Sequence, residues 1–184
     1  MWLFFDDNQR IYEAGFHPPD DFLRFELSVN CRNTQAIHRE VMTLYAGSVT
    51  PEVKGPPGRD IELIPSEDQA ATVAGVIQRL CGSEEVPPQD IVVLSGHGWE
   101  NSPVRASLPG AYALTRKRGE LGRKVFFSSI RAFKGLESPV VILCELENLD
   151  KDTRDQLLYV GISRARNHCV IVTPSLPARQ DVSS

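Results

Sequence analysis

Residues 124–146 read KVFFSSIRAFKGLESPVVILCEL, and this stretch decides the fold. A short apolar run leads to two serines, and a nearly continuous apolar run follows at 139–146. An apolar run of this kind, preceded by a glycine-containing connection, is typical of a parallel strand covered on both faces. The polar connection holds Lys134, Gly135 and Glu137. We expect it at the carboxyl end of a strand, where open α/β sheets bind ligands.

The rest of the chain supplies further strands and helices in alternation. Apolar periodicity and turn residues predict strands at 22–27, 61–64, 91–94 and 168–173, and helices from 33 or 34 to about 46, from a capping box at 66–69 to about 80, and from about 153 to 166. Alternation of this kind predicts an α/β fold with a mostly parallel sheet and right-handed crossovers. We place His38 on the solvent side of the first helix.

The bulk properties narrow the class of protein. The chain has 184 residues, enough for one domain with its own core. Its net charge of −4 and pI near 5.6 disfavour a free-standing nucleic-acid-binding domain, so any DNA contact must be local or shared. We predict no membrane segment and no secretory leader, since no apolar run reaches the ~18–20 residues of a membrane span.

The four cysteines are widely spaced and none belongs to a C-x-x-C pair. We therefore predict no zinc site, no disulfide framework and no other metal site, and we expect a cytoplasmic protein. Cys144 and Cys169 lie inside apolar runs and are interpreted as small core residues.

The segment 96–123 is the most basic part of the chain and the least patterned. It could present arginines and lysines to DNA, or it could form a solvated hairpin or helix face. Trp99 has two corresponding interpretations, a base-stacking residue or a local packing anchor, and packing is the commoner role for a single tryptophan in a loop.

The connection in the opening stretch resembles motif V of the superfamily 1 DNA helicases of the UvrD/Rep group. Ser129, Arg131, Lys134, Gly135 and Glu137 stand at the matching positions, although the family usually has Thr and His at the first two. The resemblance implies that Ser129, Arg131 and Lys134 contact single-stranded DNA. It also implies that Gly135 and Glu137 lie at the nucleotide, with Glu137 on the ribose or coupling the cleft to DNA.

Two earlier segments resemble motifs III and IV of the same family. DDNQRIY, residues 6–12, implies that Gln9 senses the γ-phosphate and that Tyr12 contacts DNA. LSVNCRNT, residues 27–34, implies that Arg32 contacts phosphate, a role that suits a planar, always charged and bidentate group. Without the resemblance, residues 6–12 are interpreted as a helix cap that follows a strand. Arg32 is then interpreted as a surface arginine in an ion pair, before a helix cap.

The segment QLLYVGISRA, residues 156–165, resembles motif VI and is the most specific of the four matches. Helical spacing places Leu157, Gly161 and Arg164 on one face, which predicts that Arg164 points inward. A buried guanidinium needs an anionic partner, and the alternative to a catalytic role is a structural ion pair. Gly161 costs about 1 kcal/mol against alanine in a helix, which predicts a close approach there.

Together the motifs resemble the second RecA-like domain of a superfamily 1 helicase, preceded by motif III of the first. The expected fold is a RecA-like, P-loop NTPase-type three-layer domain. The expected division is 1–16 for the end of the first domain, 17–174 for the second and 175–184 for a disordered tail. The resemblance implies a DNA helicase or translocase in which Arg32 and Arg164 act as arginine fingers on ATP, with Gln9 as sensor.

The implied cofactors are ATP and Mg²⁺, and the implied partners are single-stranded DNA and an upstream RecA-like domain of the same polypeptide. No G-x-x-x-x-G-K-[ST] phosphate loop occurs in the sequence, so we expect no turnover by this chain alone. The alternative is a catalytically inactive helicase-like interaction or regulatory module. Cys31 and Ala14 favour it, because the family has aromatic residues at both positions. An unrelated nucleotide-binding α/β domain is disfavoured by the missing phosphate loop.

Overall fold

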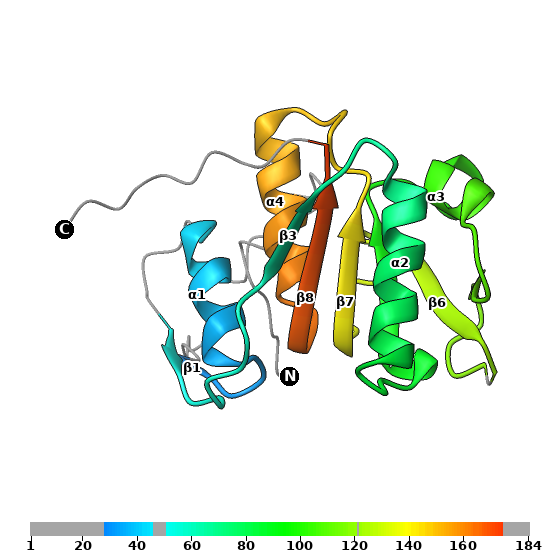
Figure 1. Cartoon of the computed structure of the whole chain (residues 1–184). Helices are drawn as coiled ribbons and strands as arrows, with labels where there is room; N and C mark the ends of the chain where they lie inside the picture. The colour runs from blue at the N-terminus through cyan, green and yellow to red at the C-terminus, as the bar shows by residue number, and fades with distance from the viewer. Residues whose placement is uncertain (1–27, 46–50, 121, 175–184) are drawn as a thin grey trace, which may run out of the picture.

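The computed structural model describes residues 28–45, 51–120 and 122–174. Their main feature is a six-stranded sheet in the order β3-β8-β7-β4-β6-β5, in which every neighbouring pair is parallel. Helices α2 and α4 lie on opposite faces of this sheet (Figure 1). The predicted three-layer α/β fold with a mostly parallel sheet is confirmed, and within the described residues the large sheet is entirely parallel.

The elements follow the predicted alternation, with β1 and β2 forming a separate parallel pair beside α1. The strands are β1 (Val29–Asn30), β2 (Glu52–Val53), β3 (Glu62–Pro65), β4 (Ile91–Ser95), β5 (Ala113–Thr115), β6 (Lys124–Ser129), β7 (Ser138–Cys144) and β8 (Ala165–Thr173). The helices are α1 (Gln35–Thr43), α2 (Gln69–Gly82), α3 (Pro103–Ser107) and α4 (Lys151–Ile162), with short 3₁₀ turns η2 (Pro88–Asp90) and η3 (Trp99–Asn101).

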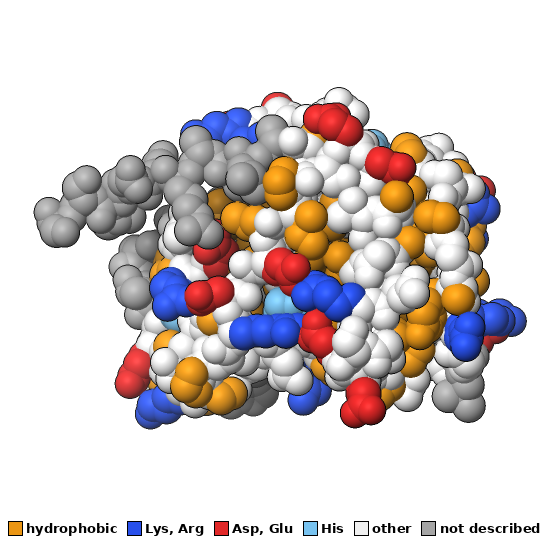
Figure 2. Space-filling view, in the orientation of Figure 1, with side chains coloured by type: hydrophobic (Ala, Val, Ile, Leu, Met, Phe, Trp, Pro, Cys, Tyr) orange, Lys and Arg blue, Asp and Glu red, His pale blue; other side chains and the backbone are white. Residues whose placement is uncertain are grey.

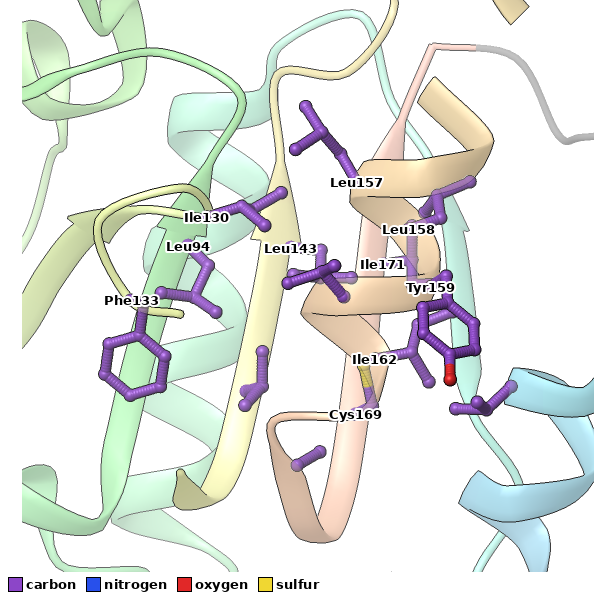
Figure 3. Close-up of a cluster of buried hydrophobic side chains, with 14 of the residues drawn as sticks. Leu94, Ile130, Phe133, Leu143, Leu157, Leu158, Tyr159, Ile162, Cys169 and Ile171 are labelled. Atoms are coloured by element: carbon purple, nitrogen blue, oxygen red, sulfur yellow. The ribbon is translucent and has the colours of Figure 1, made fainter. Parts of the chain in front are cut away.

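The two faces of the sheet carry two separate apolar clusters, because successive side chains of a strand point to opposite sides. On β4, Val92 and Leu94 join the cluster under α1 and α4, whereas Ile91 and Val93 join the cluster under α2 and α3. In the first cluster Leu143 of β7 lies between the side chains of Leu94 and those of α4 (Figure 3). Burial on both faces explains why the central strands have continuous apolar sequences.

The buried cysteines confirm the interpretation of two apolar runs. Cys144 and Cys169 lie at opposite faces of the sheet with no exposed surface. Burial raises the pKa of both thiols, so they remain protonated. All four cysteines are free.

Side-chain caps fix where the three long helices begin. The Thr34 side chain accepts a hydrogen bond from the Ile37 amide, and the Asp150 side chain accepts one from Thr153. The bond to Thr153 lowers the pKa of Asp150. For α2 the predicted cap at Ser66 is wrong, because the carboxylate of Asp68 reaches the free amide of the first turn.

A buried carboxylate follows β7 at the carboxyl edge of the sheet. Glu145 is 3% exposed and adopts a left-handed backbone conformation, with φ of 60°. Its carboxylate accepts hydrogen bonds from the hydroxyls of Ser95 and Ser102 and from the Val104 amide at the start of α3. These three donors explain how a charged group is accommodated in the interior.

A second buried ionisable group, His168, lies near the amino end of β8. Its ring nitrogens are buried and have no hydrogen-bond partner within the described ranges. Burial, reinforced by the positive charge of Arg59, lowers the pKa of His168, while Glu62 and Glu84 oppose that shift. Arg59 forms an ion pair with Glu84, and Arg79 forms one with Glu62. Figure 2 shows acidic and basic side chains interspersed on one face of the molecule.

The basic segment 96–123 contains structure that the sequence pattern did not predict. It forms η3, the short helix α3 and the edge strand β5. The last helix, predicted to reach residue 166, is shorter than predicted. It ends at Ile162, and β8 begins at Ala165.

Residues 1–27, with the predicted strand at 22–27, lie outside the described residues, as does the tail at 175–184, and the predicted division of the chain stays a prediction. No helix in the described portion is long and apolar enough to cross a membrane.

Candidate functional site

Arg164 lies between α4 and β8, at the amino edge of the sheet. We predicted that Arg164 lies on a face of the last helix, but α4 ends before it, because Ser163 is the C-cap. The Arg164 side chain is nevertheless 2% exposed, since it turns back along the last turn of the helix. Nε donates to the Val160 carbonyl oxygen at 3.2 Å, and Nη2 donates to Ser163 Oγ at 2.9 Å. The predicted burial of Arg164 is confirmed, but by a different local geometry.

Gly161 confirms the predicted close approach in the last helix. A Cβ placed on Gly161 would lie 2.7 Å from Cδ2 and 3.1 Å from Cδ1 of Leu143. Leu143 belongs to the central strand β7 and is fully buried. The glycine therefore allows α4 to pack directly on the sheet, one turn before Arg164.

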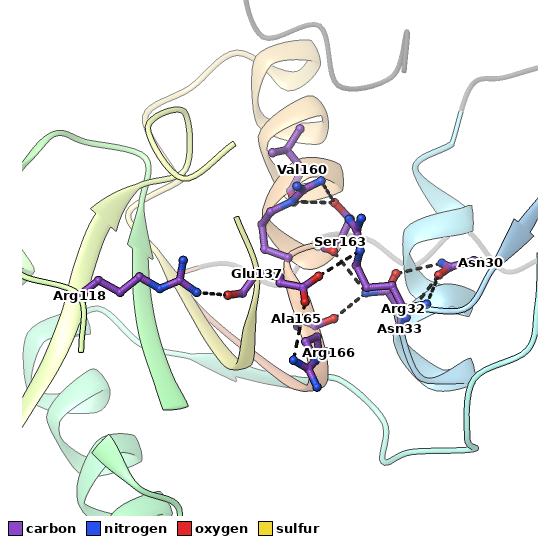
Figure 4. Close-up of polar contacts among 10 residues, drawn as sticks. Asn30, Arg32, Asn33, Arg118, Glu137, Val160, Ser163, Ala165 and Arg166 are labelled. Atoms are coloured by element: carbon purple, nitrogen blue, oxygen red, sulfur yellow. Dashed lines mark hydrogen bonds and ion pairs between the residues drawn. The ribbon is translucent and has the colours of Figure 1, made fainter. Parts of the chain in front are cut away.

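Glu137 lies between two arginines from distant parts of the chain. Its Oε2 is 3.1 Å from Nε of Arg32, and its Oε1 is 3.7 Å from Nη1 of Arg166 (Figure 4). The three side chains are 41–52% exposed. Two guanidinium groups beside one carboxylate leave a net positive charge open to solvent, which suits the binding of phosphate oxygens. Exposed ion pairs contribute little to stability, so folding alone does not require this cluster.

The position of Glu137 corrects one prediction. We expected the whole connection at the carboxyl end of a strand, but Glu137 directly precedes β7 and lies at the amino edge of the sheet. The reason is topological: β6 and β7 run in the same direction, so the connection must return across the full height of the sheet. Ser129 and Glu137 are thereby placed at opposite edges.

Motif IV and motif VI are joined by hydrogen bonds through Asn33. Its Nδ2 donates to the carbonyl oxygens of Ser163, at 3.2 Å, and Ala165, at 2.6 Å (Figure 4). Asn30 in turn donates to Asn33 Oδ1 at 2.9 Å and contacts Nδ1 of His38 at 3.2 Å.

His38 is buried, so the predicted surface position is wrong. Its Nε2 lies 3.1 Å from the carbonyl oxygen of Pro51, the residue before β2.

The remaining motif V residues lie toward the other edge of the sheet. Ser129 ends β6 and is half-buried, and its Oγ accepts a hydrogen bond from the Ala132 amide at 3.2 Å. Arg131 is half-buried and Lys134 is exposed, and the positive φ of 85° at Gly135 closes the turn between them and Glu137. The structure therefore brings Arg32 and Glu137 together beside the backbone of Arg164, and it separates them from Ser129.

Two arginines of the site, Arg166 and Arg118, are not among the residues predicted from the sequence. Arg166 was detectable, because it follows Arg164 by two residues at the start of a strand. Arg118 was not, because only the fold brings the basic segment to motif V. Its Nη2 donates to the Glu137 carbonyl oxygen at 2.6 Å, and its guanidinium lies 5.6 Å from the ring centre of Phe133.

Trp99 acts as a packing residue. Its ring meets that of Phe127 edge to face, with centres 5.6 Å apart, and the guanidinium groups of Arg105 and Arg116 lie 4.8 Å and 5.9 Å from its centre. These contacts support the interpretation of Trp99 as a local anchor rather than a base-stacking residue.

Gln9 and Tyr12 lie outside the described residues, so their predicted roles stay predictions. Among residues 28–45, 51–120 and 122–174, no group of three or more His, Cys, Asp or Glu side chains is placed to hold a metal ion.

The three-layer architecture with its parallel six-stranded sheet is a RecA-like α/β fold. A solved structure with this fold is the C-terminal domain of a possible DNA helicase from Lactobacillus plantarum WCFS1. It is similar over 80% of this chain and 90% of its own, with a TM-score of 0.59 and 20% sequence identity. The helicase of PRRSV is a weaker match, with a TM-score of 0.40, 15% identity, and coverage of 84% of this chain and 24% of its own.

Residues 124–172 match the family of the UvrD-like helicase C-terminal domain. This segment contains the motifs identified above as V and VI, so the predicted resemblance to the second RecA-like domain of UvrD-like helicases is confirmed. No curated protein sequence matches the chain significantly.

Proposed function

We propose that this chain is the second motor domain of an ATP-dependent DNA helicase or translocase. An upstream RecA-like domain of the same polypeptide completes the ATP cleft. The observation that carries the proposal is the meeting of three sequence-distant segments at one sheet edge. Arg32 pairs with Glu137 at 3.1 Å, and Asn33 bonds to the carbonyl groups on both sides of Arg164. The family match over residues 124–172 supports the same conclusion independently.

In this proposal Arg32 and Arg164 are the arginine fingers of the cleft. Bound ATP supplies the phosphoryl group and the free energy of the cycle. Arg32 is exposed and carries donors that fit phosphate oxygens, and Arg164 acts from a buried position, where a charge interacts more strongly than in water. An arginine in such a role can be worth ~10³–10⁵ in rate.

Three further residues complete the proposed nucleotide site. Glu137 contacts the ribose or couples the cleft to DNA, Gly135 keeps the backbone close to the nucleotide, and Gln9 acts as sensor. We assign Mg²⁺ to the upstream domain, as the resemblance implies. The 184-residue chain by itself is therefore expected to show no DNA-stimulated ATP hydrolysis.

Single-stranded DNA is the proposed second ligand. Ser129, Arg131 and Lys134 of motif V contact its backbone, together with Tyr12, and the protein acts in the cytoplasm. Lys134 is exposed and Arg131 half-exposed, which leaves both charges free to approach phosphates. Contacts of this kind weaken as the salt concentration rises, because binding releases counterions.

The second candidate is a helicase-like module without turnover, which serves interaction or regulation. Cys31 favours it: the residue is exposed beside Arg32, and the family has an aromatic side chain there to stack on adenine. The two candidates differ in one measurable property, ATP turnover by the complete polypeptide.

The deciding experiment is single-stranded-DNA-stimulated ATP hydrolysis by the complete polypeptide that carries this domain. Wild type is compared with Arg164→Ala, and nucleotide binding is measured in parallel. The matched control is Arg39→Ala, which removes an exposed arginine whose ion pair with Asp60 lies outside the cluster around Glu137. We expect Arg164→Ala to lower kcat by about a hundredfold or more with ATP still bound, and Arg39→Ala to leave kcat unchanged.

Equal turnover with and without Arg164 would refute its assignment as an arginine finger. A wild-type polypeptide that binds ATP but never hydrolyses it would instead support the regulatory module. Hydrolysis by the 184-residue chain alone would contradict the need for an upstream domain.

A further inference from the structure

Asn33 uses all of its hydrogen-bonding groups on the segment around Arg164 and on motif IV. The side chain is buried, with 4% of the residue exposed. Its Nδ2 group donates to Ser163 O and Ala165 O, at 3.2 Å and 2.6 Å, and its Oδ1 accepts from Asn30 Nδ2 at 2.9 Å. The two carbonyl groups belong to the residues immediately before and after Arg164. These contacts fix the direction of the amide, because a reversed group would place its oxygen against two carbonyl oxygens.

The backbone at Arg164 needs hydrogen-bond partners from other segments, because it lies between the end of α4 and the start of β8. The last carbonyl groups of a helix lack partners within the helix. Here Asn33 binds the first and third of three successive carbonyls, and the amide of Ser138 in β7 donates to the second, that of Arg164 itself, at 3.0 Å. The next carbonyl, that of Arg166, accepts from the Thr34 amide at 3.3 Å.

The backbone of Arg164 is therefore held from two sides. One side is the loop that carries Arg32, and the other is the strand that follows Glu137. Both neighbouring segments carry residues of the proposed nucleotide site. The direction of a side chain depends on the backbone from which it leaves, and a misplacement of about 1 Å can cost about a hundredfold in rate.

We infer that Asn33 is the positioning residue for Arg164, an inference that rests on the proposed function. Only an amide of this length supplies two donors from one nitrogen and an acceptor at the same time. Aspartate has the same shape without the donors, and alanine removes the group. Through Asn33 any displacement of the loop at residues 30–34 is transmitted to both ends of Arg164, so that the two proposed arginine fingers move together.

The kinetic test compares Asn33→Asp and Asn33→Ala with Thr34→Ala in the complete polypeptide. Thr34→Ala removes the N-cap of α1, which costs about 0.5–2 kcal/mol of stability, yet it keeps both bonds from Asn33. It therefore controls for loss of stability in the same segment. We expect both Asn33 variants to lower kcat about tenfold or more with the KM for ATP changed less than about threefold, because only transition-state contacts are lost. We expect Thr34→Ala to leave kcat within about twofold of wild type.

A second readout, independent of activity, uses the 184-residue chain and its ¹⁵N–¹H NMR spectrum. The Nε–H group of Arg164, assigned by its loss in Arg164→Lys, is buried and bonded to Val160 O. We expect its exchange with solvent to accelerate about tenfold or more in both Asn33 variants and to stay unchanged in Thr34→Ala.

The two readouts separate the possible failures. Unchanged Nε–H exchange in the Asn33 variants, or a fall in kcat no larger than that of Thr34→Ala, would overturn the positioning role even if the wild type hydrolyses ATP. A wild-type polypeptide without turnover would overturn the proposed function, which is a different result from either of these.

Discussion

Replacement of Gly161 by alanine should destabilise the protein, although alanine favours helices. In an open helix the change gains about 1 kcal/mol. At this position the new Cβ would lie 2.7 Å from Cδ2 of Leu143, so this fully buried side chain of the central strand would have to shift. Overpacking of this kind costs about 1–3 kcal/mol. The net expectation is a loss of about 0–2 kcal/mol.

Gly75 provides the matched control for this substitution. It also lies inside a long helix, α2, but a Cβ there would meet nothing within 4 Å. Gly75→Ala should therefore stabilise the chain by about 0.5–1 kcal/mol. The measurement is urea unfolding of the 184-residue chain at constant pH, followed by circular dichroism.

A double-mutant cycle isolates the contact itself. If Cβ overlap is the cause, Gly161→Ala should be much less costly in a Leu143→Ala background, with a coupling of about 1–3 kcal/mol. Cβ overlap is refuted as the cause if Gly161→Ala stabilises the chain as much as Gly75→Ala does, or if the cycle shows no coupling.

Two further predictions concern the buried ionisable groups. The pKa of His168 is lowered in the folded state, so the folded protein binds fewer protons than the unfolded chain below about pH 6.5. The free energy of unfolding should then decrease as the pH falls from 7.5 to 5.5, with at most about 1.4 kcal/mol per pH unit from this group. In urea unfolding, the stability of His168→Val should depend less steeply on pH than that of wild type. Parallel pH dependences of the two proteins would contradict the lowered pKa of His168. Glu145→Gln should lower the free energy of unfolding by about 1–3 kcal/mol, because an amide nitrogen would face donors that now bind a carboxylate. The exposed control Glu147→Gln should change that free energy by less than about 0.5 kcal/mol. Equal effects of the two variants in urea unfolding would contradict the role of the carboxylate.

The layers of the fold were predictable because they depend on patterns of burial. Continuous apolar runs marked β4 and β7, and Gly161 marked the close contact between helix and sheet. The ends of the elements were less predictable. No glycine or proline follows Ile162 to mark the end of α4. The sequence also did not decide which residue caps α2, because serine and aspartate are both common N-cap residues, and the structure uses Asp68 rather than Ser66.

The part of the candidate site that could be predicted from the sequence consists of residues that belong to recognisable motifs. Arg164 is buried as expected, and Arg32 lies beside Glu137. The network of Asn33 and His38 was not predictable, because it depends on the carbonyl oxygen of Pro51 and on carbonyl groups more than a hundred residues away. Arg118 illustrates the same point, since only the sheet order brings the segment before β6 to the connection after it.

The connection between β6 and β7 joins the two edges of the sheet through the core. Residues 130–135 form turns, and only two further residues precede β7. The side chains of Ile130 and Phe133 are buried in the cluster under α4. A displacement at Ser129 would therefore meet packed side chains before it could reach Glu137 at the opposite edge, so the two ends of this connection are coupled through the core.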